Sequence, residues 1–141
     1  MAARIIDGKT IAADLSQRVA DAVRRVTSEH GLEPGLAVVL VGDNPASETY
    51  VRSKTAKTAT TNMRSYFYKL PATASEGEVL ELVGRLNQDP TVHGILVQLP
   101  LPPRIRSRRI IEAISPAKDV DGFHPLTAGL QNRTVRRVMQ E

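Results

Sequence analysis

The stretch SETYVRSK, Ser47 to Lys54, holds the first residues whose types and spacing could do chemistry. If it is helical, Tyr50 and Lys54 share one face, with about 6 Å between their Cβ atoms. An aromatic ring beside an amine could hold a flat, anionic ligand next to a group that carries a proton. The same spacing also suits a core tyrosine and a solvated lysine, which is the commoner arrangement. The later stretches LVQLPLP and KDVDGFHP therefore decide between these interpretations.

Gln98 is a polar residue at the end of a stretch otherwise made of Ile, Leu and Val. A buried side-chain amide must be hydrogen-bonded, because an unpaired one costs about 1–3 kcal/mol. Its partner is either nearby backbone or Lys54, whose ammonium group the amide oxygen would steer. Pro100 and Pro102 follow, and because they lack N–H groups and fix φ, they either end a strand or form a stiff wall.

The stretch KDVDG, Lys118 to Gly122, places two carboxylates at positions i and i+2. Either they cap backbone groups in a loop, or one of them accepts two N–H bonds from a heterocycle such as an amino-pyrimidine. His30, His93 and His124 lack zinc-site spacing, so we expect no metal. The sequence contains no GxGxxG loop, no P-loop and no nucleophile elbow.

The composition is that of an ordinary globular protein. Of 141 residues, 41% are apolar and 24% are charged, which is enough for one domain with a real core. No apolar run is long enough to cross a bilayer, and the N-terminus, MAARIIDGKT, lacks the apolar segment of a signal peptide. The lack of cysteine excludes disulfides and thiolate metal sites. These features favour a cytoplasmic location.

The net charge is +4, and arginines are concentrated late in the chain. The residues concerned are Arg104, Arg106, Arg108, Arg109, Arg133, Arg136 and Arg137. Such a patch could attract nucleic acid or an anionic metabolite. Because few aromatic residues are interleaved with the arginines to stack on bases, a solvated face is favoured and we expect no nucleic-acid partner.

Apolar periodicity predicts a first helix that Thr10 caps and that runs to about His30, with Gly31 as its stop. Its apolar stripe is formed by Ile11, Leu15, Val19, Val23 and Val26. The β-branched run LAVVLV at 36–41 then predicts a strand buried on both faces.

Asp43 or Asn44 can cap a second helix, which has Pro45 in its first turn and carries Tyr50 and Lys54. Its threonine-rich second half is expected to fray, and Asn62 can close it in the left-handed conformation.

Residues 64–70 and 93–99 predict two further strands. Between them Ser75 and Glu78 have capping-box spacing, which opens a helix that ends before Pro90. Its inward residues are Val79, Leu82, Val83 and Leu86, and a short helix with Ile110, Ile111 and Ile114 follows the last strand.

The alternation of strands and helices predicts an α/β fold, a three-layer, open and mainly parallel sheet with flanking helices. Ligands in such sheets bind beyond the carboxyl ends of the strands. Here those ends follow Val41 and Leu70 and lie at 98–101, so Tyr50 and Lys54 can lie close to that edge.

Taken together, these segments resemble the N-terminal catalytic domain of the bifunctional methylenetetrahydrofolate dehydrogenase/cyclohydrolase family, FolD. The matching stretches are IIDGKTIA (5–12), PGLAVVLVGDNPASETYVRSK (34–54), HGILVQLPLP (93–102) and KDVDGFHP (118–125). The resemblance extends from residue 5 to about 130. The motifs YVxxK, VQLPLP and KDVDG, in that order and spacing, form a specific set.

The resemblance implies a role for each candidate residue. Lys54, Gln98 and Asp121 would be catalytic: Lys54 is the catalytic lysine, Gln98 tunes it, and Asp121 binds the pterin edge. Tyr50 would stack on the aminobenzoate ring of the folate. The residues implied to bind substrate are Tyr50, Val97, Pro100, Leu101 and Asp121.

The resemblance also implies a reaction in one-carbon metabolism that supplies purine biosynthesis. Methylene-tetrahydrofolate gives a hydride to NADP, and the methenyl product is hydrolysed to formyl-tetrahydrofolate, so the family is both an oxidoreductase and a hydrolase. The expected partner is the tetrahydrofolate substrate, and a homodimer is possible.

Two features depart from the family pattern. After residue 130 the sequence reads QNRTVRRVMQE, so the expected organisation is a folate-binding domain at 1–130, an atypical basic tail at 131–141, and no Rossmann domain for NADP. TAKTATTNM also replaces the family's lysine-, alanine- and glutamate-rich helix end. A catalytically impaired folate-binding or assembly module of the same fold is therefore the alternative function.

Overall fold

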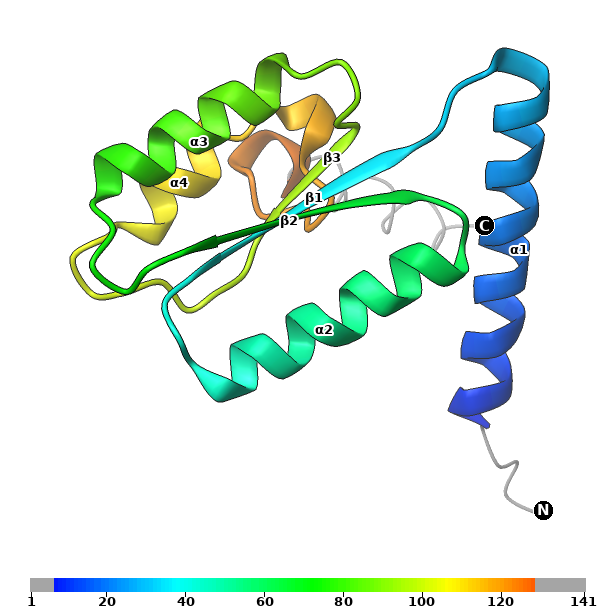
Figure 1. Cartoon of the computed structure of the whole chain (residues 1–141), viewed down its shortest axis with the longest axis horizontal. Helices are drawn as coiled ribbons and strands as arrows, with labels where there is room; N and C mark the ends of the chain where they lie inside the picture. Colours follow the sequence, from blue (N-terminus) through cyan, green and yellow to red (C-terminus); the bar gives the residue numbers. More distant parts are fainter. Residues whose placement is uncertain (1–6, 129–141) are drawn as a thin grey trace, which may run out of the picture.

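A three-stranded parallel sheet forms the centre of the protein, seen here in a computed structural model that describes residues 7–128 (Figure 1). The strands are β1 (Gly35–Val41), β2 (Arg64–Leu70) and β3 (Gly94–Val97), in the order β2-β1-β3. β1 is central, with Val38 beside Phe67 on one side and Leu96 on the other. The parallel α/β sheet predicted from the sequence is confirmed.

Helices cover both faces of this sheet, which gives the three layers expected (Figure 1). α2 (Pro45–Thr60) lies on one face, and α3 (Glu76–Gln88) and α4 (Ser107–Ala113) lie on the other. α1 (Gly8–His30) stands beside the C-terminal part of α2, and a single 3₁₀ turn, η1 (Pro116–Lys118), follows α4. Among the described residues no helix is both long and apolar enough to span a membrane.

The core is divided unequally between the two faces of the sheet. Alternate residues of β1 point to opposite faces, so Ala37, Val39 and Val41 pack beneath α3 and α4. On the other face the buried cluster of described residues consists of Val38, Leu40, Val51 and Leu96, with Leu36 packed against it. Within residues 7–128 the core on the face that carries α2 is therefore the smaller of the two.

Local sequence signals account for most helix boundaries. Asn44 accepts hydrogen bonds from the amides of Ala46 and Ser47, and Ser75 and Glu78 form the predicted capping box. Gly31 ends α1 at φ +63°, and Asn62 follows α2 at φ +61°. These assignments confirm the expected caps.

The start of α1 differs from the prediction. Asp7, not Thr10, is the N-cap, because its carboxylate accepts hydrogen bonds from the amides of Lys9 and Thr10. The stripe expected to be buried is also mostly uncovered by the described residues, since Ile11 and Leu15 are more than half exposed. Of the predicted stripe, only Val23 is fully buried.

Two other elements can be compared with the predictions. α2 extends to Thr60, and the hydroxyls of Thr58 and Thr60 donate to carbonyl oxygens of the preceding turn. The fraying expected for this end of the helix stays a prediction. β3 ends at Val97 rather than 99, although the Gln98 amide still donates to Val39. The basic tail expected at 131–141 lies outside the described residues.

Candidate active site

Lys54 and Gln98 meet at the carboxyl edge of the sheet. Lys54 lies in the third turn of α2, and Gln98 directly follows β3. The Lys54 ammonium nitrogen donates a hydrogen bond to Gln98 Oε1 at 3.2 Å. Both side chains are partly buried, so their contact is shielded from bulk water on one side. The sequence left open whether the Gln98 amide bonds to backbone or to Lys54, and the structure has it do both.

The orientation of the Gln98 amide is fixed by its second hydrogen bond. Gln98 Nε2 donates to the carbonyl oxygen of Leu99 at 2.8 Å, so the carbonyl end of the amide must face Lys54. An acceptor in that position holds the ammonium group in one place and leaves its remaining protons free for another partner. This arrangement can present a proton to a ligand at the edge of the sheet.

Asp121 supplies the acidic group of the cluster. Burial raises its pKa, the nearby charge of Lys54 opposes this shift, and the charge of Asp119 adds to it. The two carboxylates of KDVDG therefore differ in role. Asp121 makes no hydrogen bond to a described residue through its side chain, whereas Asp119 is held by the loop around it. A partly buried carboxylate with open acceptor positions can bind paired N–H donors.

Tyr50 and Pro100 are open to solvent beside these groups. Tyr50 is 63% exposed and lies one helical turn before Lys54, so its ring is free to stack on a flat ligand. The side chains of Val97 and Leu101 are not brought to the cluster. Both belong to the core beneath α3 and α4. For Val97 the reason is that successive residues point to opposite faces of the sheet, so Val97 faces away from Gln98.

Asp119 is the functional candidate that the sequence did not separate from its neighbour. Its carboxylate accepts hydrogen bonds from the amides of Gly122 and His124, at 3.1 and 3.0 Å, and from the Thr127 hydroxyl. Burial opposes ionisation of Asp119, but these hydrogen bonds outweigh it and lower the pKa. The available signal was the Asx-type loop that two aspartates around one residue suggest.

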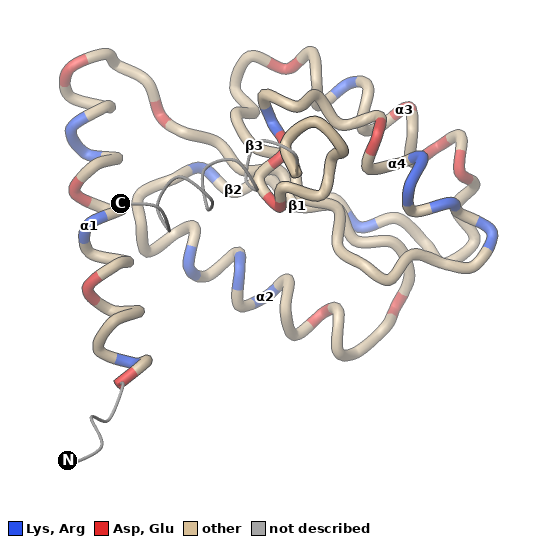
Figure 2. Tube along the Cα trace, turned by 180° about the vertical axis from the view of Figure 1, so that it is seen from behind, with Lys and Arg blue, Asp and Glu red and all other residues tan. Residues whose placement is uncertain are grey.

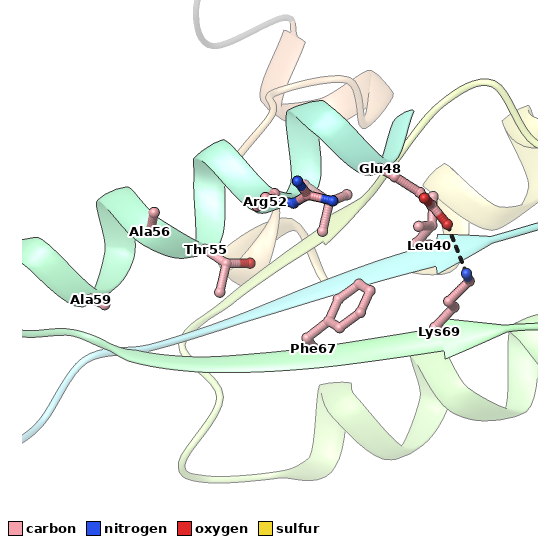
Figure 3. Close-up of a pocket in the computed structure, with 9 residues that line it drawn as sticks. Leu40, Glu48, Arg52, Thr55, Ala56, Ala59, Phe67 and Lys69 are labelled. Atoms are coloured by element: carbon pink, nitrogen blue, oxygen red, sulfur yellow. Dashed lines mark hydrogen bonds and ion pairs between the residues drawn. The ribbon is translucent and has the colours of Figure 1, made fainter. Parts of the chain in front are cut away.

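An apolar groove lies on the other flank of α2, away from this cluster (Figure 3). It has a volume of about 500 Å³ between α2 and β2, and Phe67 and Leu40 form part of its lining. The α2 residues on this side are Glu48, Val51, Arg52, Thr55, Ala56 and Ala59. Lys69 bonds to Glu48 at its rim. Because Tyr50 and Lys54 project from the opposite flank, the groove is separate from the candidate site.

Most late arginines within the described residues are used in structural contacts. Arg106 and Arg109 both pair with Glu76, at 2.8 and 2.9 Å, and Arg108 pairs with Glu112. Arg104 donates to backbone carbonyl oxygens of the loop before α3. Acidic residues alternate with the basic ones around α3 and α4 (Figure 2), so this part of the chain does not form a uniform basic face. Residues 7–128 also contain no group of three acidic or histidine side chains that could hold a metal.

Comparison with known proteins identifies what the chain resembles. The family model described as tetrahydrofolate dehydrogenase/cyclohydrolase, catalytic domain, matches residues 6–121. The chain is 61% identical over 129 residues to the bifunctional protein FolD of Bradyrhizobium diazoefficiens, and 59% identical to that of Rhodopseudomonas palustris. Each match covers 92% of this chain and 44% of the relative, so the chain spans less than half the length of these proteins.

Solved structures give the same result. The bifunctional enzyme FolD of Campylobacter jejuni superposes with a TM-score of 0.85 at 46% identity, over 87% of this chain and 43% of that chain. FolD of Trypanosoma brucei, solved with NADP cofactor and an inhibitor, gives a TM-score of 0.87 at 34% identity. That match covers 92% of this chain and 44% of that chain.

Proposed function

The chain belongs to the tetrahydrofolate dehydrogenase/cyclohydrolase family, and on that premise we propose that residues 1–130 form a folate-binding catalytic domain of one-carbon metabolism. The proposed substrates are methylene- and methenyl-tetrahydrofolate. The observation that carries the proposal is the hydrogen bond between Lys54 and Gln98, beside a partly buried Asp121 whose side chain accepts none from the described residues. Tyr50 offers the exposed ring that a flat folate needs.

The hydrolytic step follows from the chemistry of these groups. Water adds to the methenyl carbon of the cation and loses one proton, which gives a neutral carbinol. One carbon–nitrogen bond then breaks as its nitrogen gains a proton and the carbinol hydroxyl loses one, leaving a formyl group and one released proton overall. Lys54 is positioned to move these protons, an effect worth about 10²–10⁴-fold for a well-placed group. Asp121 would hold the pterin through paired N–H bonds, and Pro100 would line the cleft.

NADP is the proposed acceptor for the hydride of the oxidative step, as expected from the family. The turn from β1 to α2 does not fit the phosphates of a dinucleotide. Its sequence is Gly42-Asp43-Asn44, and Asn44 already occupies the amides of Ala46 and Ser47 that a phosphate would need. We therefore assign no NADP-binding role to this turn.

Two further points belong to this proposal. A cytoplasmic location is proposed from the cysteine-free composition, and a homodimer from the family resemblance. Nucleic-acid binding is not proposed, because Arg104, Arg106, Arg108 and Arg109 are engaged within the protein.

The test is to mix the chain with methenyl-tetrahydrofolate and follow the loss of its absorbance. We expect acceleration over buffer that Lys54→Met abolishes. Lys57→Met is the matched control, because Lys57 is an exposed lysine of the same helix. Folate binding without turnover would instead support the binding-module alternative. No acceleration and no binding by the folded chain would reject both.

A further inference from the structure

The loop that carries Asp121 is built around the carboxylate of Asp119. Three donors converge on that carboxylate: the amides of Gly122 and His124 and the hydroxyl of Thr127. All three come later in the chain than Asp121. The loop therefore closes back on Asp119, and Asp121 lies inside the closed segment.

Asp121 is held from both sides by this arrangement. Before it, the backbone of Asp119 forms a parallel bridge with Ile95 of β3, which ties the loop to the sheet. After it, Gly122 turns the chain at φ +69°, a conformation that favours glycine, and its amide is bonded to Asp119. Only Val120 separates the two aspartates, so Asp119 determines where the Asp121 backbone lies.

The start of the loop has a second anchor on α3. Lys118 Nζ donates to the carbonyl oxygens of Leu86 and Asp89, at 3.0 and 2.8 Å, near the C-terminus of that helix. The residues just before Asp121 are thus fixed to both β3 and α3. Rigid support of this kind is what a binding carboxylate requires to keep its geometry.

We propose that Asp119 is a positioning residue, whose charged side chain holds the 119–127 loop so that Asp121 faces Lys54. This inference rests on the proposed function for the identity of the ligand, but the placement of Asp121 can be measured without any ligand. An aspartate suits the position better than asparagine, because all of its partners are donors and an amide would present its NH₂ group to one of them.

The experiment compares Asp119→Asn with wild type by NMR titration of the Asp121 carboxyl and by binding of 5-formyl-tetrahydrofolate. We expect the pKa of Asp121 to fall, because a neighbouring negative charge is lost and the loosened loop admits water. Folate binding should weaken about tenfold or more, as expected when hydrogen bonds to a charged group are lost.

Two further variants keep the test decisive. Thr127→Val removes one donor but keeps the charge of Asp119, so weaker folate binding in this variant reports position rather than charge. It also replaces Asp119→Asn if that protein does not fold. Asp7→Asn is the matched control, because the Asp7 carboxylate also accepts hydrogen bonds from two amides and one hydroxyl, those of Lys9 and Thr10, at the start of α1.

The proposal is overturned if the Asp121 titration in Asp119→Asn or in Thr127→Val matches that of wild type, or if Asp7→Asn has the same effect. It is also overturned if Thr127→Val leaves folate binding by a folate-binding wild type unchanged. A wild-type chain that binds no folate rejects the proposed function instead. In that case the Asp121 titration in Thr127→Val, which keeps the charge of Asp119, still decides the role of Asp119, with Asp7→Asn beside it as the control.

Discussion

The substitution Gly94→Ala should disturb the Asp121 loop from beneath. Gly94 begins β3 and lies beside Leu36 of β1. A Cβ added at Gly94 would stand 2.6 Å from Val120 Cγ1 and 3.2 Å from Leu36 Cδ1. Val120 is the residue between the two aspartates of the loop, so the steric clash would displace the segment that carries Asp121.

The size of the effect follows from these distances. Non-bonded carbon atoms rest at about 3.5–4.0 Å, so Val120 must retreat by about 1 Å. A misplacement of about 1 Å in a catalytic site can cost about 10²-fold in rate. The free energy of unfolding should fall by about 1–3 kcal/mol, as is typical of one extra methyl group in a packed site.

The assay is methenyl-tetrahydrofolate hydrolysis together with urea unfolding. The double variant Gly94→Ala/Val120→Ala should recover most of the activity, because removal of Cγ1 leaves Val120 Cβ at an ordinary 3.8 Å. Gly84→Ala is the matched control, since a Cβ there meets nothing within 4 Å. Unchanged turnover in folded Gly94→Ala would refute the reasoning, because it would mean that Val120 rotates without moving the loop.

Three other predictions concern stability and are each checked by urea unfolding. Gly35→Ala should be more destabilising than Gly94→Ala, because its Cβ would overlap the backbone carbonyl oxygen of Thr91; equal or greater stability than Gly94→Ala would contradict this. Ile95→Ala should lower the free energy of unfolding by about 2–5 kcal/mol, because this side chain is fully buried in the core; a change below about 1 kcal/mol would mean that the core collapses around the gap. Glu76 should make stability depend on pH, because hydrogen bonds from the Arg106 side chain and backbone, with the charges of Arg106 and Arg109, lower its pKa from 4.5 to about 2. Its contribution is full above pH 4.5 and is lost as the pH falls to about 2, so Glu76→Gln should flatten the pH dependence in that window, and an unaltered profile would show that these ion pairs do not stabilise the fold.

The strands and most helix ends could be predicted because their signals are local. The continuous β-branched run LAVVLV predicts a strand buried between helices on both faces, and in the structure it forms the central strand β1. Ser75 and Glu78 satisfy each other within one turn, and Asn62 needs only its own tolerance of positive φ. The cap at Asp7 was missed because Thr10 is also an acceptable cap, and only the geometry shows that Thr10 donates to Asp7.

The candidate site could be predicted only in part, because it depends on contacts between distant segments. The spacing of Tyr50 and Lys54 on one helix is local, and Gln98 was a candidate because it is a polar residue at the end of an apolar stretch. The resemblance then selected Asp121 from the two aspartates. The different roles of Asp119 and Asp121 could not be predicted from the residues, because they depend on which backbone amides of the loop fold back and donate to Asp119. Val97 was assigned to the cleft although it adjoins Gln98 and so faces the opposite side of the sheet.

The most direct test of the account is to map 5-formyl-tetrahydrofolate binding onto the chain by NMR. The account predicts saturable shifts centred on Tyr50, Lys54, Gln98 and Asp121, with the Gln98 side-chain amide among the largest. Shifts confined to the apolar groove around Phe67 and Leu40, on the other flank of α2, would contradict it.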